Sequence, residues 1–351
     1  MVALAFATLG VVWILSQVDW DATIFVGFGE DAQPTRQFAE ERIGEVFLRS
    51  GQGHDGKYFF VQGNDPWVLE PEVNAVVLDR PLYRSQRMFY PLLAGGFGLF
   101  SAEGVVWGLL VVNVIAMGLG TWAVAVLAVE MGLSSWWGLA FLLNIGLVSE
   151  LNIGGAGIVA AAAAFGAVAL FSKNRFWWGV GLLVVAALSR EVMLLVAAGS
   201  AWWWWRIRGD RARALWTILV PTAAVALWAL YLRLQISSDG GAGQIQEIGL
   251  PFVGFYQALT NYWIGGSIED LVVGVGLMVL LLVFVRQVVV SDNLVGWAFL
   301  PFAVLGVLLT EQVWRSYFDI SRAVAPVITS FVLLVFADRA DRTQSKALLS
   351  A

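Results

Sequence analysis

The chain has 351 residues, of which 59% are hydrophobic and only 13% charged, and its mean hydropathy is +0.76. A soluble globular domain carries nearly twice that charged fraction, so this many apolar residues cannot be buried in one water-soluble core and point to a lipid bilayer. The absence of cysteine excludes disulfides and a thiol nucleophile, and a single histidine, His54, excludes a multi-histidine metal site. The net charge of −5 excludes little, because position matters more than total charge in a membrane protein.

The first apolar stretch, residues 1–17, is just long enough to cross a bilayer. A cleaved signal peptide is the alternative, but the stretch lacks a basic start and a clear cleavage site. A large outer loop is then predicted at 18–102. Within it, 36–49 has the pattern of a short amphipathic helix at the membrane surface. Residues 88–100 are apolar but short and rich in glycine and proline, so we interpret them as a half-embedded segment rather than a span.

Nine further apolar runs bring the predicted number of transmembrane helices to about ten. They cover 103–130, 133–149, 156–172, 176–189, 191–205, 212–233, 267–286, 294–311 and 322–337. The sequence therefore predicts an all-α polytopic membrane protein that forms a single integral membrane domain over 1–351. The outer loop 18–102 is expected to carry interfacial helices, and a second outer loop is predicted at 234–266.

Basic residues decide the predicted orientation. They gather at 173–175, at 206–213, at Arg286 and in the C-terminal tail. Ten spans with both termini inside place all four groups in the cytoplasm, as the positive-inside rule requires. Most of the remaining polar residues then face outward, so we expect the functional site on the outer face.

The stretch 176–205 admits two interpretations. As one helix it would be about 45 Å long and would place the basic groups at 173–175 and 206–213 on opposite sides. Two short elements that meet near Arg190 and Glu191 keep both groups on the same side. We favour the two elements, which predicts that Arg190 and Glu191 lie at the outer face.

The first group of polar residues is the segment GHDGKYFF at 53–60. Glycines on both sides of Asp55 allow a tight turn that exposes its carboxylate to a ligand. A carboxylate partly removed from water could act as a general base toward a hydroxyl, although a plain Asp-Gly turn in a solvated loop is the alternative. We expect His54 and Tyr58 to contact substrate. Asp65 is a further candidate, and Asp55 and Asp65 together could hold a divalent cation through oxygen ligands.

The second group is RPLYRSQRMFYP at 80–91, directly before a membrane-entering segment. Guanidinium groups pair with phosphate in bidentate fashion, which makes Arg84 and Arg87, together with Tyr90, candidates for substrate binding. The alternative is that these arginines and tyrosines anchor the chain at the level of the lipid headgroups.

The third group is Arg190 and Glu191 within an otherwise apolar sequence. Ionisable residues at membrane depth are costly and by default mark a functional cavity, whereas a structural salt bridge to another span is the alternative. Glu150, Asp319 and Arg322 also fall near the predicted outer face and could line the same cavity. Of these three, we include Arg322 among the substrate-binding candidates.

These groups carry a resemblance to a known class. HDGKYF at 54–59, followed by RMFYPL at 87–92, resembles the W-D-G-x-W/F-Y and F/Y-x-P-L-Y-P-L types of motif in glycosylphosphatidylinositol mannosyltransferase-like bacterial membrane proteins. ALSRE at 187–191 is similar to a later arginine-containing segment of these proteins. They belong to the GT-C class of glycosyltransferases, which use polyprenyl-phosphate sugars. The chain departs from the pattern in having His54 where an aromatic residue is expected, and in a shortened second motif.

The resemblance implies that a sugar, mannose-like or other, is transferred from a polyprenyl-phosphate donor to a glycan or lipid acceptor. The site would lie on the outer face of a bacterial plasma membrane. Asp55 would be the catalytic base, and Arg87 and Arg190 would neutralise the departing polyprenyl phosphate. Membrane lipids are the other expected partners, and no nucleic acid is expected.

Two other functions compete with this one. A lipid or solute transporter would often show paired repeats and broken helices, but we find no convincing internal repeat, and the large first loop also argues against it. A non-catalytic assembly subunit of a cell-envelope pathway is the other alternative. In that case Asp55 could be replaced without loss of function.

Overall fold

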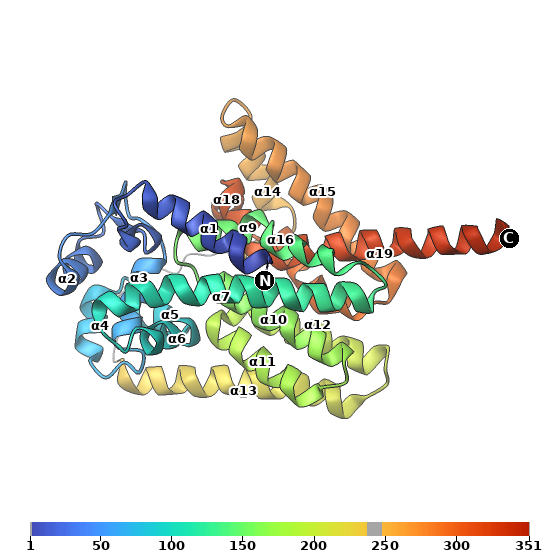
Figure 1. Ribbon diagram of the computed structural model, residues 1–351, viewed down its shortest axis with the longest axis horizontal. Helices are drawn as coiled ribbons and strands as arrows, with labels where there is room; N and C mark the ends of the chain where they lie inside the picture. The colour runs from blue at the N-terminus through green and yellow to red at the C-terminus, as the bar shows by residue number, and fades with distance from the viewer. Residues whose placement is uncertain (1, 237–247, 351) are drawn as a thin grey trace.

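The computed structural model describes residues 2–236 and 248–350, and these are almost entirely helical (Figure 1). The first part contains α1 (Val2–Ser16), η1 (Ala22–Phe25), β1 (Phe28–Gly29), α2 (Gln33–Ile43), β2 (Leu48–Arg49), α3 (Gly56–Asn64), α4 (Pro71–Val77), α5 (Pro81–Ser85) and α6 (Phe89–Phe97). The middle contains α7 (Ala102–Glu130), η2 (Ser135–Gly138), α8 (Leu139–Leu142), α9 (Ile145–Asn152), α10 (Gly157–Ser172), α11 (Phe176–Ser189), η3 (Glu191–Met193), α12 (Leu194–Arg206) and α13 (Arg211–Gln235). The last part contains α14 (Val253–Ala258), the π-helix η4 (Leu259–Trp263), α15 (Ile268–Ser291), α16 (Leu294–Leu308), α17 (Glu311–Trp314), α18 (Tyr317–Ala323) and α19 (Ala325–Ser350).

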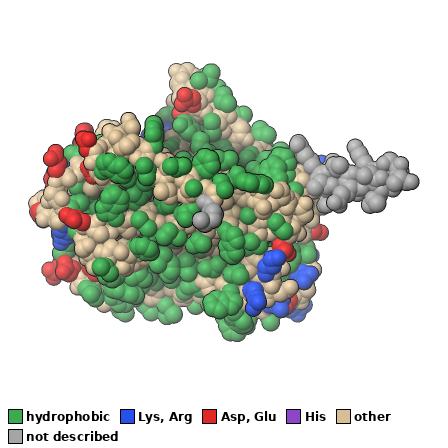
Figure 2. All heavy atoms as spheres, in the orientation of Figure 1, with side chains coloured by type: hydrophobic (Ala, Val, Ile, Leu, Met, Phe, Trp, Pro, Cys, Tyr) green, Lys and Arg blue, Asp and Glu red, His purple; other side chains and the backbone are tan. Residues whose placement is uncertain are grey.

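The described helices support membrane insertion, but they do not confirm ten full-length spans. Three helices, α7, α13 and α15, are long and apolar enough to cross a bilayer, and α18 with the first part of α19 would add a fourth, bent by 69°. The apolar helices α1, α10, α11 and α16 have only 14 to 16 residues, whereas a simple span needs about 20. Hydrophobic side chains cover much of the surface in Figure 2, as expected of a protein in contact with lipid.

The run 133–149, predicted as one helix, is divided in the structure into η2, α8 and part of α9. The reason lies in two polar side chains that begin new helices. Ser134 accepts a hydrogen bond from the backbone N–H of Trp136, and Asn144 accepts one from the N–H of Gly146. Asn144 also donates to the carbonyl oxygen of Ala325 at 2.7 Å. These hydrogen bonds compete with a continuous helix, and the prediction of one span was wrong here.

The stretch 176–205 forms two helices, so the prediction of two elements is confirmed. Arg190 has extended backbone angles (φ −156°, ψ 113°) that end α11 before η3 and α12 begin. The Phe176 ring at the start of α11 lies 5.9 Å from the Trp204 ring near the end of α12, so α11 and α12 form an antiparallel hairpin. Its open end carries both basic groups, 173–175 and 206–213, and Figure 2 shows Lys and Arg side chains gathered there, at the lower right.

Segment 18–102 folds as short helices that lie against α7 and α13 (Figure 1). The amphipathic helix predicted at 36–49 is α2, which ends earlier because Gly44 turns the chain with φ +82°. The following residues then form β2, parallel to β1. Residues 88–100 contain the short helix α6, in agreement with the prediction that they are not a span. Part of the predicted second outer loop, 237–247, lies outside the described residues, and the rest of that loop contains α14 and η4.

Helix α13 connects the hairpin to this segment. It has 25 residues, against 14 in α11, and therefore extends about 16 Å further. Along its last turns, the Trp228 indole N–H donates to the carbonyl oxygen of Ser85 at 2.8 Å, and the Tyr231 hydroxyl donates to that of Trp67 at 2.7 Å. These contacts hold segment 18–102 against α13, close to the apex of the hairpin at Arg190.

Candidate functional site

Asp55 lies directly before α3 in a turn that only glycine allows at two positions. Gly53 has φ +67°, and a Cβ atom there would lie 2.3 Å from the carbonyl oxygen of Gly27. A Cβ on Gly56 would lie 2.4 Å from the carbonyl oxygen of Val26 and 2.5 Å from that of Ile153. Both distances are far below van der Waals contact, so the glycines permit close packing of this turn against the chain around 26 and 153. The packed turn fixes the position of the Asp55 carboxylate.

Arg84 on α5 joins two carboxylates. Its guanidinium binds Asp79 in bidentate fashion, with distances of 2.8 Å and 2.9 Å, and its Nη1 donates to Oδ1 of Asp55 at 3.0 Å. The same guanidinium lies over the Tyr58 ring, 3.9 Å from its centroid. This contact is a cation–π interaction that adds to the two ion pairs. Tyr58 therefore acts in the structure as a support for Arg84.

Arg87, in the turn after α5, connects segment 18–102 to the apex of the hairpin. Its Nε and Nη2 donate to the two carboxylate oxygens of Glu191 at 3.2 Å and 3.1 Å, and Nη2 also donates to the Tyr83 hydroxyl at 2.6 Å. Its Nη1 lies 3.9 Å from Oδ2 of Asp55. Arg87 and Glu191, which lie about 100 residues apart in the sequence, thus form one bidentate pair.

Glu150 at the end of α9 lies beneath these groups, and its side chain is 2% exposed. Its Oε1 accepts hydrogen bonds from Arg190 at 3.2 Å and from Arg322 at 3.0 Å, while Oε2 accepts one from the backbone N–H of Gly157 at 3.1 Å. Glu150 therefore holds both arginines in place. Its signal in the sequence was an acidic residue at the end of an apolar run, which did not reveal this role.

One cavity of about 680 Å³ contains most of this network. Its charged lining residues are Asp55, Arg80, Arg84, Arg87, Arg190, Glu191, Asp319 and Arg322. The arginines thus outnumber the carboxylates in the lining, five to three, which favours an anionic ligand. A much smaller space beneath it, lined in part by Glu150, extends toward the start of α10.

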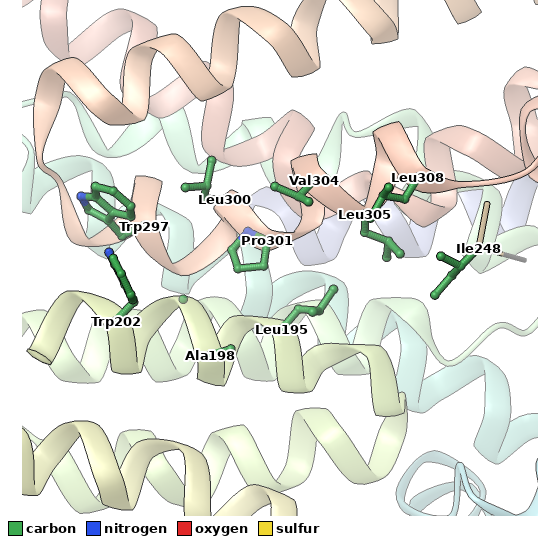
Figure 3. Close-up of a pocket in the computed structure, with 11 residues that line it drawn as sticks. Leu195, Ala198, Trp202, Ile248, Trp297, Leu300, Pro301, Val304, Leu305 and Leu308 are labelled. Atoms are coloured by element: carbon green, nitrogen blue, oxygen red, sulfur yellow. The ribbon is translucent and has the colours of Figure 1, made fainter. Parts of the chain in front are cut away.

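An apolar groove of about 500 Å³ runs between α12 and α16 (Figure 3). In Figure 3, Leu195, Ala198 and Trp202 on α12 face Trp297, Leu300, Pro301, Val304, Leu305 and Leu308 on α16. Leu195, Ile248 and Leu305 line both the groove and the charged cavity. The two spaces are therefore adjacent. Together they form one region that suits a ligand with an anionic head and an apolar chain.

Electrostatics keep Asp55 ionised. Burial by itself raises the pKa of Asp55, but the guanidinium groups of Arg84, Arg87, Arg322 and Arg190 outweigh burial and lower this pKa to about 2. Burial and the nearby Arg49 and Arg322 lower the pKa of His54, so its ring is neutral at pH 7. A neutral imidazole beside this cluster adds no further positive charge.

Six of the ten candidates from the sequence line the charged cavity: Asp55, Arg84, Arg87, Arg190, Glu191 and Arg322. His54 and Tyr58 lie next to it but are not part of its lining. Tyr90 is fully buried outside the lining of the cavity, and its hydroxyl donates to the carbonyl oxygen of Leu109 at 2.9 Å and accepts from the Asn113 side chain at 2.8 Å. With these internal partners, Tyr90 serves the packing of α6 on α7, and its role in substrate binding stays a prediction.

Asp65 is also remote from the cavity. It follows the far end of α3, about 15 Å along the helix from Asp55, and it accepts backbone hydrogen bonds from Leu69 and Glu70, both at 2.9 Å. One cation with oxygen ligands at about 2.3–2.6 Å cannot bridge that separation, so the proposed site at Asp55 and Asp65 was wrong. Among the described residues, no group of three or more Asp, Glu or His side chains could hold a metal ion.

Comparison with models of protein families and with curated proteins finds no match to this chain. Fold and site nevertheless define a class. The chain is a helical protein with segments suited to a membrane, and it carries a charged cavity next to an apolar groove.

Proposed function

We propose that the chain is a membrane glycosyltransferase that moves a sugar from a polyprenyl-phosphate donor to a hydroxyl group of a glycan or lipid acceptor. One observation carries this proposal: the arginine-rich cavity adjoins the apolar groove, with Leu195, Ile248 and Leu305 in both linings. A lipid-linked sugar has the matching chemistry, since a long hydrocarbon chain is joined to an anionic phosphate. The resemblance of segments 54–59 and 87–92 to GT-C motifs supports the same proposal.

The proposed binding mode assigns each part of the donor to one region. The polyprenyl chain would lie in the groove between α12 and α16, where burial of apolar surface is favourable. The phosphate would be held by arginines of the cavity, whose planar guanidinium groups suit its oxygens. The sugar would then lie near Asp55, which is the carboxylate that Arg84, Arg87 and Arg322 share.

In the proposed reaction, the oxygen of the acceptor hydroxyl attacks the anomeric carbon of the sugar. The new carbon–oxygen bond forms as the bond between that carbon and the phosphate oxygen breaks, and the bonding electron pair leaves with the polyprenyl phosphate. The proton of the hydroxyl passes to Asp55. Arginines stabilise the charge that develops on the leaving phosphate.

Sugar transfer by the purified full-length protein tests the proposal. A donor with a labelled sugar on polyprenyl phosphate is supplied, and wild type is compared with Asp55→Asn. The substitution preserves shape but removes the proton acceptor, so we expect transfer to fall by about 10²–10⁴. Glu72→Gln, at an exposed position on α4, is the matched control and should retain activity. A fully active Asp55→Asn protein would remove the catalytic assignment of Asp55, whereas absence of transfer by wild type would favour a non-catalytic subunit.

A further inference from the structure

The Asp55 carboxylate is held by arginines from two distant parts of the chain. Arg84 and Arg87 come from α5 and the turn after it, at 3.0 Å and 3.9 Å, and Arg322 comes from α18 at 3.7 Å. Three guanidinium groups that converge on one pair of carboxylate oxygens form the arrangement that proteins use to bind phosphate. In the structure, the anion at that point of convergence is a side chain of the protein itself.

Most arginines of the cavity are already paired with carboxylates. The lining contains five arginines, Arg80, Arg84, Arg87, Arg190 and Arg322, and three carboxylates, Asp55, Glu191 and Asp319. Two further carboxylates from outside the lining, Asp79 and Glu150, bind these arginines. Four of the five arginines, Arg84, Arg87, Arg190 and Arg322, are paired with carboxylates, whereas the Arg80 guanidinium lies 4.5 Å from the Tyr83 ring centroid. A phosphate that binds any of the four paired arginines must compete with a carboxylate.

Asp55 is the carboxylate best suited to be displaced. Glu150 is buried and accepts three hydrogen bonds, and Glu191 uses both oxygens in its bidentate pair with Arg87. Among the described residues, the Asp55 carboxylate makes only one ion pair as short as 3.0 Å, and its side chain is 32% exposed. Asp319 is also exposed, but in the described part of the chain its one ion pair is with Arg322, at 3.4 Å. Displacing Asp55 alone would free three arginines at a single point.

We infer that Asp55 occupies the position at which the cavity receives the phosphate group of its ligand, so that Asp55 and a phosphate ester compete for Arg84, Arg87 and Arg322. The inference deepens the proposed function and rests on it only in taking a lipid phosphate as the ligand. Competition also implies a sequence of events, in which donor binding precedes proton transfer to Asp55. A carboxylate paired with three arginines is a weak proton acceptor, and it becomes a better one when the donor phosphate takes over those arginines. Donor binding would thus prepare Asp55 to act as the base.

Binding measurements on the full-length protein in detergent test the competition. The probes are farnesyl phosphate, farnesol and inorganic phosphate, and the proteins are wild type, Asp55→Asn, Asp55→Glu and Glu72→Gln. We expect Asp55→Asn to bind farnesyl phosphate about tenfold more tightly than wild type, equivalent to about 1.4 kcal/mol. Asp55→Glu, which keeps the charge, and Glu72→Gln, which lies outside the cavity, should stay within about twofold of wild type. Farnesol affinity should be unchanged in all variants.

Each probe has a defined meaning. If Asp55→Asn also tightens binding of inorganic phosphate, the competition is supported and the anionic group alone suffices. If only farnesyl phosphate gains, the competition is supported and the apolar chain is required for binding. Equal or weaker farnesyl phosphate binding by Asp55→Asn would overturn the inference, because a carboxylate that competes with phosphate must weaken its binding.

Asp55→Asn leaves three arginines without one of their carboxylates, so its stability could be lower. Thermal unfolding covers that case. Farnesyl phosphate at a fixed concentration should raise the Tm of Asp55→Asn by more than it raises the Tm of wild type, since a ligand that binds more tightly stabilises the folded state more. A smaller rise would overturn the inference. Failure of the proposed function gives a different result. Asp55→Asn would still bind farnesyl phosphate more tightly than wild type, but wild type would transfer no sugar.

Discussion

The two ends of the α11–α12 hairpin both carry arginine, but in opposite chemical settings. At the apex, Arg190 pairs with Glu150, and the adjacent Glu191 pairs with Arg87. At the open end, arginines lie over aromatic rings: Arg213 is 4.9 Å from the Trp204 ring centroid, and Arg208 is 5.5 Å from that of Trp203. The apex arginines thus have carboxylate partners inside a cavity. Those at the open end have aromatic partners, and Arg213 also forms a partly exposed ion pair with Asp210 at 3.3 Å.

This difference indicates that the arginines at the open end anchor the chain at the membrane surface, whereas those at the apex belong to the candidate site. Arginine stacked on tryptophan at a helix end is typical of the interface between lipid and water, where the charge remains in contact with solvent. Arginine held by carboxylates inside a cavity must be compensated by specific partners, and those partners fix its position. The composition of the two ends therefore predicts that substitutions at the apex affect binding and stability, whereas substitutions at the open end have small effects.

The largest expected effect concerns orientation: the apex and the open end of the hairpin should lie on opposite sides of the membrane. Single cysteines placed by Ser50→Cys in segment 18–102 and by Ser172→Cys at the end of α10 can be tested in this cysteine-free chain. In intact cells, a membrane-impermeant thiol reagent should label only the first, because the basic groups near Ser172 favour the cytoplasm. The second should label after permeabilisation. Labelling of both in intact cells would contradict the predicted orientation.

The next effect is on stability. Glu150→Gln removes the charge that Arg190 and Arg322 share, and breaking a buried ion pair by removing one partner typically costs about 3–5 kcal/mol. Denaturant unfolding in detergent measures the loss. The matched control is Glu130→Gln, which removes the partner of Lys173 on the surface near the open end, and should cost less than about 1 kcal/mol. Equal losses for both variants would show that the apex network is no more important to folding than a surface pair.

A smaller effect is expected on ligand affinity. Arg190→Lys keeps the charge beside Glu150 but loses the planar fork that suits phosphate, so farnesyl phosphate should bind about tenfold more weakly. Arg213→Lys at the open end should leave the affinity unchanged. Unchanged affinity in Arg190→Lys, together with a lower Tm, would assign Arg190 a purely structural role as the partner of Glu150.

The smallest expected effect is that of pH on kcat/KM. Because nearby arginines outweigh burial and lower the pKa of Asp55 from 3.8 to about 2, the base stays ionised in the free protein. It would be lost only as pH falls through about 2, so Asp55 should produce no acid limb in kcat/KM from pH 8 down to about pH 5. The contribution of Asp55 to folding stability is likewise complete above about pH 4 and is lost as pH falls through about 2.

The turnover number should behave differently, because kcat reports the complex with bound donor. If phosphate takes the arginines from Asp55, the pKa of Asp55 rises in that complex and kcat falls at a higher pH than kcat/KM does. Measuring sugar transfer at saturating and at low donor concentrations from pH 8 to about pH 5 separates the two quantities. An acid limb that appears in kcat/KM but not in kcat would contradict this order of events.

Some residues of the site could be predicted from the sequence, and the reason is physical. Arg190 and Glu191 interrupt an apolar run, and ionisable groups there need partners, so their importance could be predicted without knowing those partners. Asp55 could be selected from its flanking glycines. Asp65 and Tyr90 were selected by the same local criteria and proved to serve local structure, because a backbone cap and an internal hydrogen bond leave no distinctive pattern in the sequence.

Composition and the positions of apolar runs determined that the chain is helical and suited to a membrane, since such a fraction of apolar residues has no other stable solvent. Local sequence also determined the break at Arg190. The tertiary structure alone decided which charges meet. Asp55, Glu150 and Arg322 come together because α18 packs on α9 and the turn at Asp55 packs against the chain around residue 153. Ion pairs between residues more than 90 positions apart depend on that packing, and no local pattern records which carboxylate each arginine will reach.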